Sequence, residues 1–229
     1  MTVTADFDRP PPGWIPLAVL LVMPILFAIF VGMALRALPL SASLFATLVV
    51  AAQDGGGILC YSALARICAW PSLRDRFTRP PRQAMIAAIA VAIGIKGGAA
   101  LIAASVADLA EPAADPLLAT RPEDLLALPV AILLVPFWEE ALFRGVLFDR
   151  LRHHFPVGGT ILASSLVFAL VHNNQLSLGL TGILLFASRF AVGAAAALFT
   201  WRYRSLTPAF MLHAANNGIT ELLSLLIPT

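Results

Sequence analysis

Charged side chains are scarce in this 229-residue sequence, of which they make up only 12%. Average soluble domains are about a quarter charged and about half apolar, whereas 59% of these residues are hydrophobic. A soluble fold of this size cannot hide so much apolar surface behind so few charges. The composition therefore excludes disordered, fibrous, coiled-coil and ordinary water-soluble proteins, and it predicts an integral membrane protein.

Lysine and cysteine are also rare, and their number and placement argue against nucleic-acid binding and against a metal or redox site built from cysteines. The net charge is only +2, and Lys96 is the single lysine beside 14 arginines. No basic run is long enough to follow a phosphate backbone, so we expect no nucleic-acid partner. The two cysteines, Cys60 and Cys68, are eight residues apart near one apolar segment. That spacing indicates packing rather than a metal or redox pair.

Long apolar runs are what the sequence contains instead. A membrane crossing needs about 20 such residues. Seven candidate segments cover residues 14–35, 41–65, 84–107, 123–150, 157–172, 176–201 and 207–227. The runs are continuous rather than alternating, which excludes a transmembrane strand barrel. We therefore predict an all-α polytopic bundle of about seven membrane helices, forming one integral membrane domain over residues 1–229.

The loop charges orient these predicted helices. The loop after the second segment carries five arginines, the loops after the fourth and sixth are also basic, and the loop after the third is acidic. Since cytoplasmic loops carry the excess of Arg and Lys, the N-terminus is predicted in the cytoplasm and the C-terminus outside. Asp6 and Asp8 precede a first run of span length, so no signal peptide is expected. The compact, Ala- and Arg-rich chain favours a prokaryotic plasma membrane.

Three of the later segments contain ionisable residues, which are costly inside a membrane and therefore indicate function. These stretches read WEEALFRG at 138–145, FALVH at 168–172 and HAANN at 213–217. Residues four apart share one face of a helix. Glu140 can therefore pair with Arg144, and Phe168 can brace His172.

The other polar residues of these stretches are also placed by the helical period. Glu139 lies about 100° around the helix from Glu140, so it cannot make the same pair and is left for another task. His213 and Asn217 aim two side chains at one region, while Asn216 is interpreted as a helix contact. Pro136 frees a backbone carbonyl, which favours a protein-lined pocket over lipid contact.

These stretches form three motifs, Glu-Glu-x-x-x-Arg, Phe-x-x-x-His and His-x-x-x-Asn, each on its own apolar segment. Together they resemble the CPBP family of intramembrane proteases, which includes the type II CAAX prenyl endopeptidases and the bacterial Abi proteins. The resemblance covers residues 123–220, a CPBP-like catalytic core, whereas the first three segments are only generically membrane-like. The family commonly has about eight helices, so an eighth helix stays open.

The resemblance implies an intramembrane endopeptidase that hydrolyses a peptide bond with a glutamate-activated water. It assigns catalysis to Glu139, His172, His213 and Asn217, and support to Glu140, Arg144 and Phe168. Glu139 would take a proton from the water that His172 positions, and the other two catalytic residues would donate hydrogen bonds to the oxyanion. The implied partners are membrane lipids and a peptide or protein substrate, which is prenylated, otherwise lipidated or unmodified.

Other functions stay open on the sequence alone. Two glutamates and two histidines can also bind zinc, but the His-Glu-x-x-His signature is absent, so we expect no cofactor and keep zinc as a minor alternative. A non-catalytic scaffold, or a bacteriocin immunity protein that acts by binding, would use the motif residues as a polar core. A transporter is disfavoured because no internal repeat is visible.

Two further cations lie inside apolar segments. Lys96 is expected to pair with Asp54 or with a pocket glutamate, or else to line the access path of the substrate. Arg189 is expected to reach a carbonyl, a lipid phosphate or the substrate. Both expectations follow from the cost of leaving a charge unpaired in the membrane.

Overall fold

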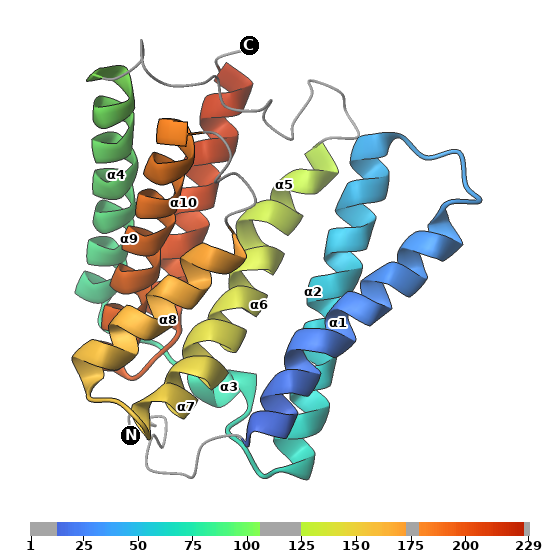
Figure 1. Cartoon of the computed structure of the whole chain (residues 1–229), viewed down its shortest axis with the longest axis horizontal. Coiled ribbons are helices and arrows are strands. Elements are labelled where there is room, and N and C mark those ends of the chain that lie inside the picture. Colours follow the sequence, from blue (N-terminus) through green and yellow to red (C-terminus); the bar gives the residue numbers. More distant parts are fainter. Residues whose placement is uncertain (1–12, 106–124, 173–178, 227–229) are drawn as a thin grey trace.

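The computed structural model describes residues 13–105, 125–172 and 179–226, and every regular element in these ranges is a helix. In chain order these are α1 (Trp14–Leu35), α2 (Ala42–Ile67), α3 (Leu73–Arg76), α4 (Arg82–Ser105), α5 (Ala127–Pro129), η3 (Val130–Leu134), α6 (Val135–Leu142), η4 (Phe143–Leu147), α7 (Phe148–Arg152), α8 (Val157–Val171), α9 (Gly179–Tyr203) and α10 (Thr207–Leu226). The continuous rod from α5 to α7 lies between the α1–α2 hairpin and the group of α4, α9 and α10 (Figure 1). The predicted all-α helix bundle is confirmed.

The outer surface of the bundle is apolar. By length and composition, four helices of the described residues can cross a membrane: α1, α2, α9 and the Arg82–Ile102 part of α4. Helix α8 is apolar but shorter. Phe30, Leu59 and Leu101 are at least two-thirds exposed, which suits lipid and not water. Each of the seven predicted segments is helical over most of its described residues, and the side on which the N-terminus lies stays a prediction.

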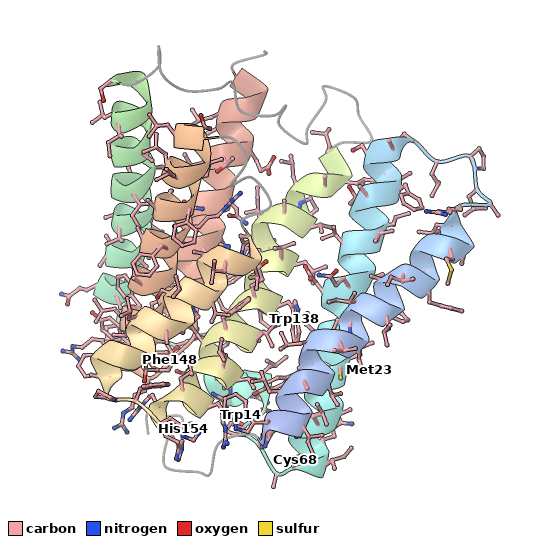
Figure 2. All side chains as sticks on the ribbon, viewed as in Figure 1. Trp14, Met23, Cys68, Trp138, Phe148 and His154 are labelled. Atoms are coloured by element: carbon pink, nitrogen blue, oxygen red, sulfur yellow. The ribbon has the colours of Figure 1, made fainter. Side chains whose placement is uncertain are left out.

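Small residues allow the helices to approach closely at two contacts. Ala84, Ala88 and Ala92 repeat every four residues on α4 and are fully buried in the group that α4 forms with α9 and α10. On the other side of the rod, Trp138 of α6 packs on Gly57 of α2 (Figure 2). A methyl group at Gly57 would lie 2.6 Å from Trp138 Cζ2, so only glycine admits the indole there.

The central rod is not a regular α-helix. Two π-helical stretches, Val130–Leu134 and Phe143–Leu147, flank α6, whose roughly two turns carry the two glutamates. In a π-turn each N–H bonds to the carbonyl five residues back, which widens the helix and shifts the following side chains around the axis. Such stretches concentrate at functional sites because they re-aim side chains.

One arginine of the basic loop after the second predicted segment is buried. Arg76 of α3 is 4% exposed, and its Nη1 lies 2.7 Å from Asp149 Oδ2. Its Nε donates to the Tyr61 hydroxyl at 2.7 Å, and its carbonyl accepts from Leu206 N at 2.9 Å. Burial disfavours the charged form, but Asp149 and Tyr61 outweigh it and hold the pKa of Arg76 above its ordinary value. Arg76 thus ties α2, α7 and the start of α10 together.

We expect Arg76→Ala to lower the free energy of unfolding by about 2 kcal/mol, because it leaves the buried Asp149 carboxylate without its charged donor. Thermal unfolding of the detergent-solubilised protein measures this loss. Arg74→Ala is the matched control, since Arg74 is an exposed arginine of the same short helix. Equal stability of the two variants would show that the Arg76 network does not hold the helix ends.

Candidate functional site

The first motif glutamate is joined to the motif histidine of α8. Glu139 Oε1 lies 3.0 Å from His172 Nε2, although the two residues are 33 positions apart. His172 is the residue after the last turn of α8, where helix carbonyls lack an N–H partner. Its ring fills this role, because Nδ1 lies 2.7 Å from the carbonyl oxygen of Phe168. The end of the helix therefore fixes the direction in which the imidazole points.

These contacts determine where a proton lies between the two side chains. A carbonyl oxygen only accepts, so His172 Nδ1 carries a hydrogen and donates it to Phe168. The contact between His172 Nε2 and Glu139 then requires one more proton, either on the imidazole or on the carboxyl group. Glu139 and His172 therefore share one proton that can move between them.

The second motif glutamate is bound through one of its two carboxylate oxygens, Oε1, whereas its buried Oε2 has no hydrogen-bond partner among the described residues. Glu140 Oε1 accepts from Arg144 Nη1 at 3.1 Å and from His213 Nδ1 at 2.9 Å. The Glu140 and Arg144 side chains are both 0% exposed. The pair expected from the four-residue spacing is thus present, and it also reaches α10. It orients His213 so that Nε2 lies 3.6 Å from Glu139 Oε2.

A backbone group that the sequence did not indicate completes this buried network. Arg144 Nη2 donates to the carbonyl oxygen of Gly193 in α9 at 3.1 Å. A methyl group at Gly193 would lie 3.2 Å from the Ser165 backbone and 3.3 Å from the guanidinium. A side chain at this position would therefore force its neighbours in α8 and the rod to shift by a few tenths of an ångström. No motif marks it, since Gly193 stands in a run of small residues typical of any membrane helix.

Phe168 forms a wall shared by three site residues. Its ring centroid lies 4.4 Å from that of His172 and 5.5 Å, edge-on, from that of His213. Arg144 Cζ lies 4.3 Å from the same centroid, on the cation–π face. The predicted bracing of His172 is present, and the same ring also restrains two groups from other helices.

Asn217 is held by the irregular part of the rod. Val135 N–H bonds to the Val130 carbonyl five residues back, so the corresponding partner of the Ala131 carbonyl would be Pro136, which has no N–H. Asn217 Nδ2 donates to that carbonyl at 2.9 Å instead. The carbonyl expected to need a partner because of Pro136 is thus satisfied across the helix interface. The second amide hydrogen of Asn217 is not used by this bond.

The predicted catalytic residues meet at one cavity of about 320 Å³. It is lined by Glu139, His172, His213 and Asn217, together with Phe168. Glu139 and His172 are 17% and 28% exposed at the side chain, whereas Glu140 and Arg144 lie behind the wall. Asn216, interpreted from the sequence as a helix contact, also lines the cavity, and its Nδ2 donates to Asn217 Oδ1 at 3.4 Å. The structure therefore brings all four together from three elements far apart in sequence.

Three more charged residues line the same cavity: Lys96 of α4, Arg189 of α9 and Glu221 of α10. Lys96 interacts electrostatically with Arg189 and Glu221, whereas Asp54 interacts with Glu139. Lys96 thus lies within electrostatic range of a cavity glutamate, whereas Asp54 is not among the charges that act on it. Glu221 was missed, although it extends the i, i+4 series of His213 and Asn217 by one turn, and that spacing could have found it.

The arrangement of the His, Cys, Asp and Glu side chains indicates whether the site can bind a metal ion. Within residues 13–105, 125–172 and 179–226, no group of three or more His, Cys, Asp and Glu side chains is arranged to hold a metal ion. Both ring nitrogens of His172 and Nδ1 of His213 already contact protein oxygens. The described residues do not fit a zinc site of the usual kind.

Comparison with known families identifies the part of the chain that carries this site. Residues 121–219 match the family model described as type II CAAX prenyl endopeptidase Rce1-like. This region is similar to that family of proteases. It is the branch of the CPBP family that the three motifs resemble, and the matched residues include all three motifs. Searches of curated proteins and of solved structures found no match.

The family match and the apolar helices together indicate the class of protein and the class of its substrate. The protein is an integral membrane protein of the CAAX-protease kind, and a peptide or protein is its class of substrate. Helices α1, α2 and α4 lie outside the matched residues, yet α4 contributes Lys96 to the cavity. The endopeptidase-like region therefore shares its cavity with a helix from the first part of the chain.

Proposed function

We propose that this protein hydrolyses a peptide bond inside the membrane with a water molecule activated by Glu139. The observation that carries the proposal is the unequal state of the two glutamates. Glu139 faces the cavity, and its Oε2 has no hydrogen-bond partner among the described residues. Glu140 has an unpartnered Oε2 as well, but it is wholly buried outside the lining of the cavity, and its Oε1 is bound to Arg144 and His213. Of the two motif glutamates, only Glu139 can therefore accept a proton at the cavity.

The proton shared by Glu139 and His172 supports this role. With the proton on the imidazole, Glu139 is a carboxylate whose Oε1 is held by His172 and whose Oε2 can take a proton from water. The water oxygen then attacks the peptide carbonyl carbon. As the tetrahedral intermediate collapses, the proton passes from Glu139 to the leaving amine nitrogen. The general base thereby becomes the general acid, and every proton is accounted for.

Two donors are positioned for the developing oxyanion. His213 Nδ1 donates to the Glu140 carboxylate, and Nε2 of the same ring donates to the oxyanion when it also carries a hydrogen. Asn217 keeps one amide hydrogen beyond the hydrogen bond to Ala131. Donors held in advance by buried partners stabilise a transition-state charge without reorganising. We assign this function to His213 and Asn217.

A second, mostly apolar cavity favours a lipidated substrate. It measures about 190 Å³ and is lined by residues of α2, α5, η3, α6 and α10. Val135, Asn217 and Glu221 line both cavities, so the two adjoin. A prenyl or acyl chain beside the scissile bond would occupy such an apolar space.

The experiment compares prenylated and unprenylated peptides of one sequence, ending in a cysteine followed by three residues, with the purified protein in detergent micelles. We expect cleavage of the prenylated peptide and none by Glu139→Gln. Equal cleavage of both peptides would remove the preference for lipid but not the hydrolysis. Binding of the peptides without turnover by the unmodified protein would favour the scaffold and contradict the proposal.

We further expect turnover to survive metal removal, because the described donors already serve other partners. Dialysis against EDTA or phenanthroline should leave the rate within about twofold of that of the untreated protein. The measurement is paired with elemental analysis of the purified protein. A loss of activity that zinc restores, with zinc bound in stoichiometric amount, would establish the metalloenzyme alternative.

A further inference from the structure

The cations in the cavity have no part in the proposed hydrolysis. Lys96, Arg189 and Glu221 are charged residues inside apolar helices, where each charge is costly and indicates a function. Lys96 and Glu221 have opposite charges and act on each other electrostatically. Arg189, whose positive charge also acts on Lys96, is the remaining excess cation of this group.

The guanidinium of Arg189 has unused hydrogen-bonding capacity. Its Nη1 is buried against the protein and has no hydrogen-bond partner among the described residues. A buried donor without an acceptor destabilises the protein, so a bound group that supplies the acceptor is favoured. Arg189 also acts electrostatically on His172, which places this cation near the catalytic pair.

We propose that Arg189, with Lys96 beside it, binds the C-terminal carboxylate of the substrate peptide. This inference rests on the proposed hydrolysis and adds a specificity site to it. A guanidinium binds a carboxylate through two parallel, charge-assisted hydrogen bonds, and the second cation adds attraction in a low-dielectric cavity. At about 320 Å³, the cavity is at the small end of ligand pockets, so only a short fragment fits between Glu139 and Arg189.

The test measures binding separately from cleavage. Two prenylated peptides of one sequence, one ending in a free carboxylate and the other in an amide, are bound to Glu139→Gln protein in micelles of neutral detergent. We expect the acid to bind at least about tenfold more tightly than the amide, as one charge-assisted hydrogen bond implies. Adding Arg189→Gln should abolish this difference.

The control is another arginine of the same helix. Arg202 in the last turn of α9 is exposed, and Arg202→Gln removes one positive charge without touching the cavity. This variant should keep the full preference for the acid. In protein with Glu139 intact, Arg189→Gln should raise KM for the acid peptide and leave kcat within about twofold, because the lost contact binds substrate and transition state alike.

Each outcome separates the inference from the hydrolysis on which it rests. The proposed carboxylate site would be overturned if Arg189→Gln protein still prefers the acid peptide. It would also be overturned if protein that retains Arg189 binds the acid and the amide peptides equally. Neither result would affect the proposed hydrolysis. A lipid phosphate has the same chemistry, so phosphatidylglycerol is added as a competitor. If this lipid displaces the acid peptide and the amide peptide equally, and does so only from protein that retains Arg189, then Arg189 binds lipid instead. If the acid peptide binds preferentially but neither the unmodified protein nor any variant cleaves it, the carboxylate site is supported and the proposed hydrolysis is contradicted.

Discussion

Glu139→Gln is expected to lower the rate of peptide cleavage by a factor of about 100 to 10,000, the usual contribution of a general base. The glutamine side chain has nearly the same shape, and its amide N–H can donate a hydrogen bond to Nε2 of the neutral His172 ring. It cannot take a proton from water, so only the chemical step is lost. Steady-state cleavage of the prenylated peptide measures the change, and unaltered peptide binding would place the loss in kcat.

The matched control for this prediction is Ser188→Ala. Ser188 lines the same cavity but has no part in the proposed mechanism, so its removal should leave turnover within a few-fold. His172→Ala and His213→Ala should also abolish cleavage while the protein still inserts into the membrane. Full activity of Glu139→Gln, with a normal thermal unfolding curve, would reject Glu139 as the base.

Arg144→Met is expected to lower the free energy of unfolding by about 3–5 kcal/mol, the largest stability effect predicted for this chain. The substitution leaves the Glu140 carboxylate in a fully buried position, with only His213 as its partner. It also removes the donor to Gly193 and the cation above Phe168. Chemical or thermal unfolding in a fixed detergent measures the loss.

The double variant Arg144→Met with Glu140→Gln tests the physical reason. Both charges are then removed, and the amide oxygen of the glutamine can still accept from His213 Nδ1. We expect the double variant to regain most of the stability that the single variant loses, so the two changes should be strongly non-additive. If both variants lose the same amount, the stability comes from packing of the arginine side chain and not from the ion pair.

Contacts within one helix were predictable because the helical period fixes them. The four-residue spacing from Glu140 to Arg144 and from Phe168 to His172 sets which side chains meet, whatever surrounds them. Both contacts are present in the structure. The same rule left Glu139 without a local partner, and it faces the cavity.

Contacts between helices could not be predicted in this way, because they depend on which surfaces pack together. The π-helical turns of the rod leave the Ala131 carbonyl open, and helix packing brings Asn217 to it. Arg144 reaches Gly193 only because α9 approaches at a residue without a side chain. Lys96 and Glu221 line one cavity because α4 packs on α10 rather than on α2.

The sequence by itself determined the membrane environment, the helical class and the three motifs, since composition and local spacing do not depend on the tertiary structure. Only the tertiary structure decided that Arg76 is buried in a network, that one glutamate is locked and the other faces a cavity, and that Arg189 shares this cavity. The physical reason is distance along the chain. A helix specifies its own faces within a few residues, whereas a site built from α4, the rod, α8, α9 and α10 exists only after they pack.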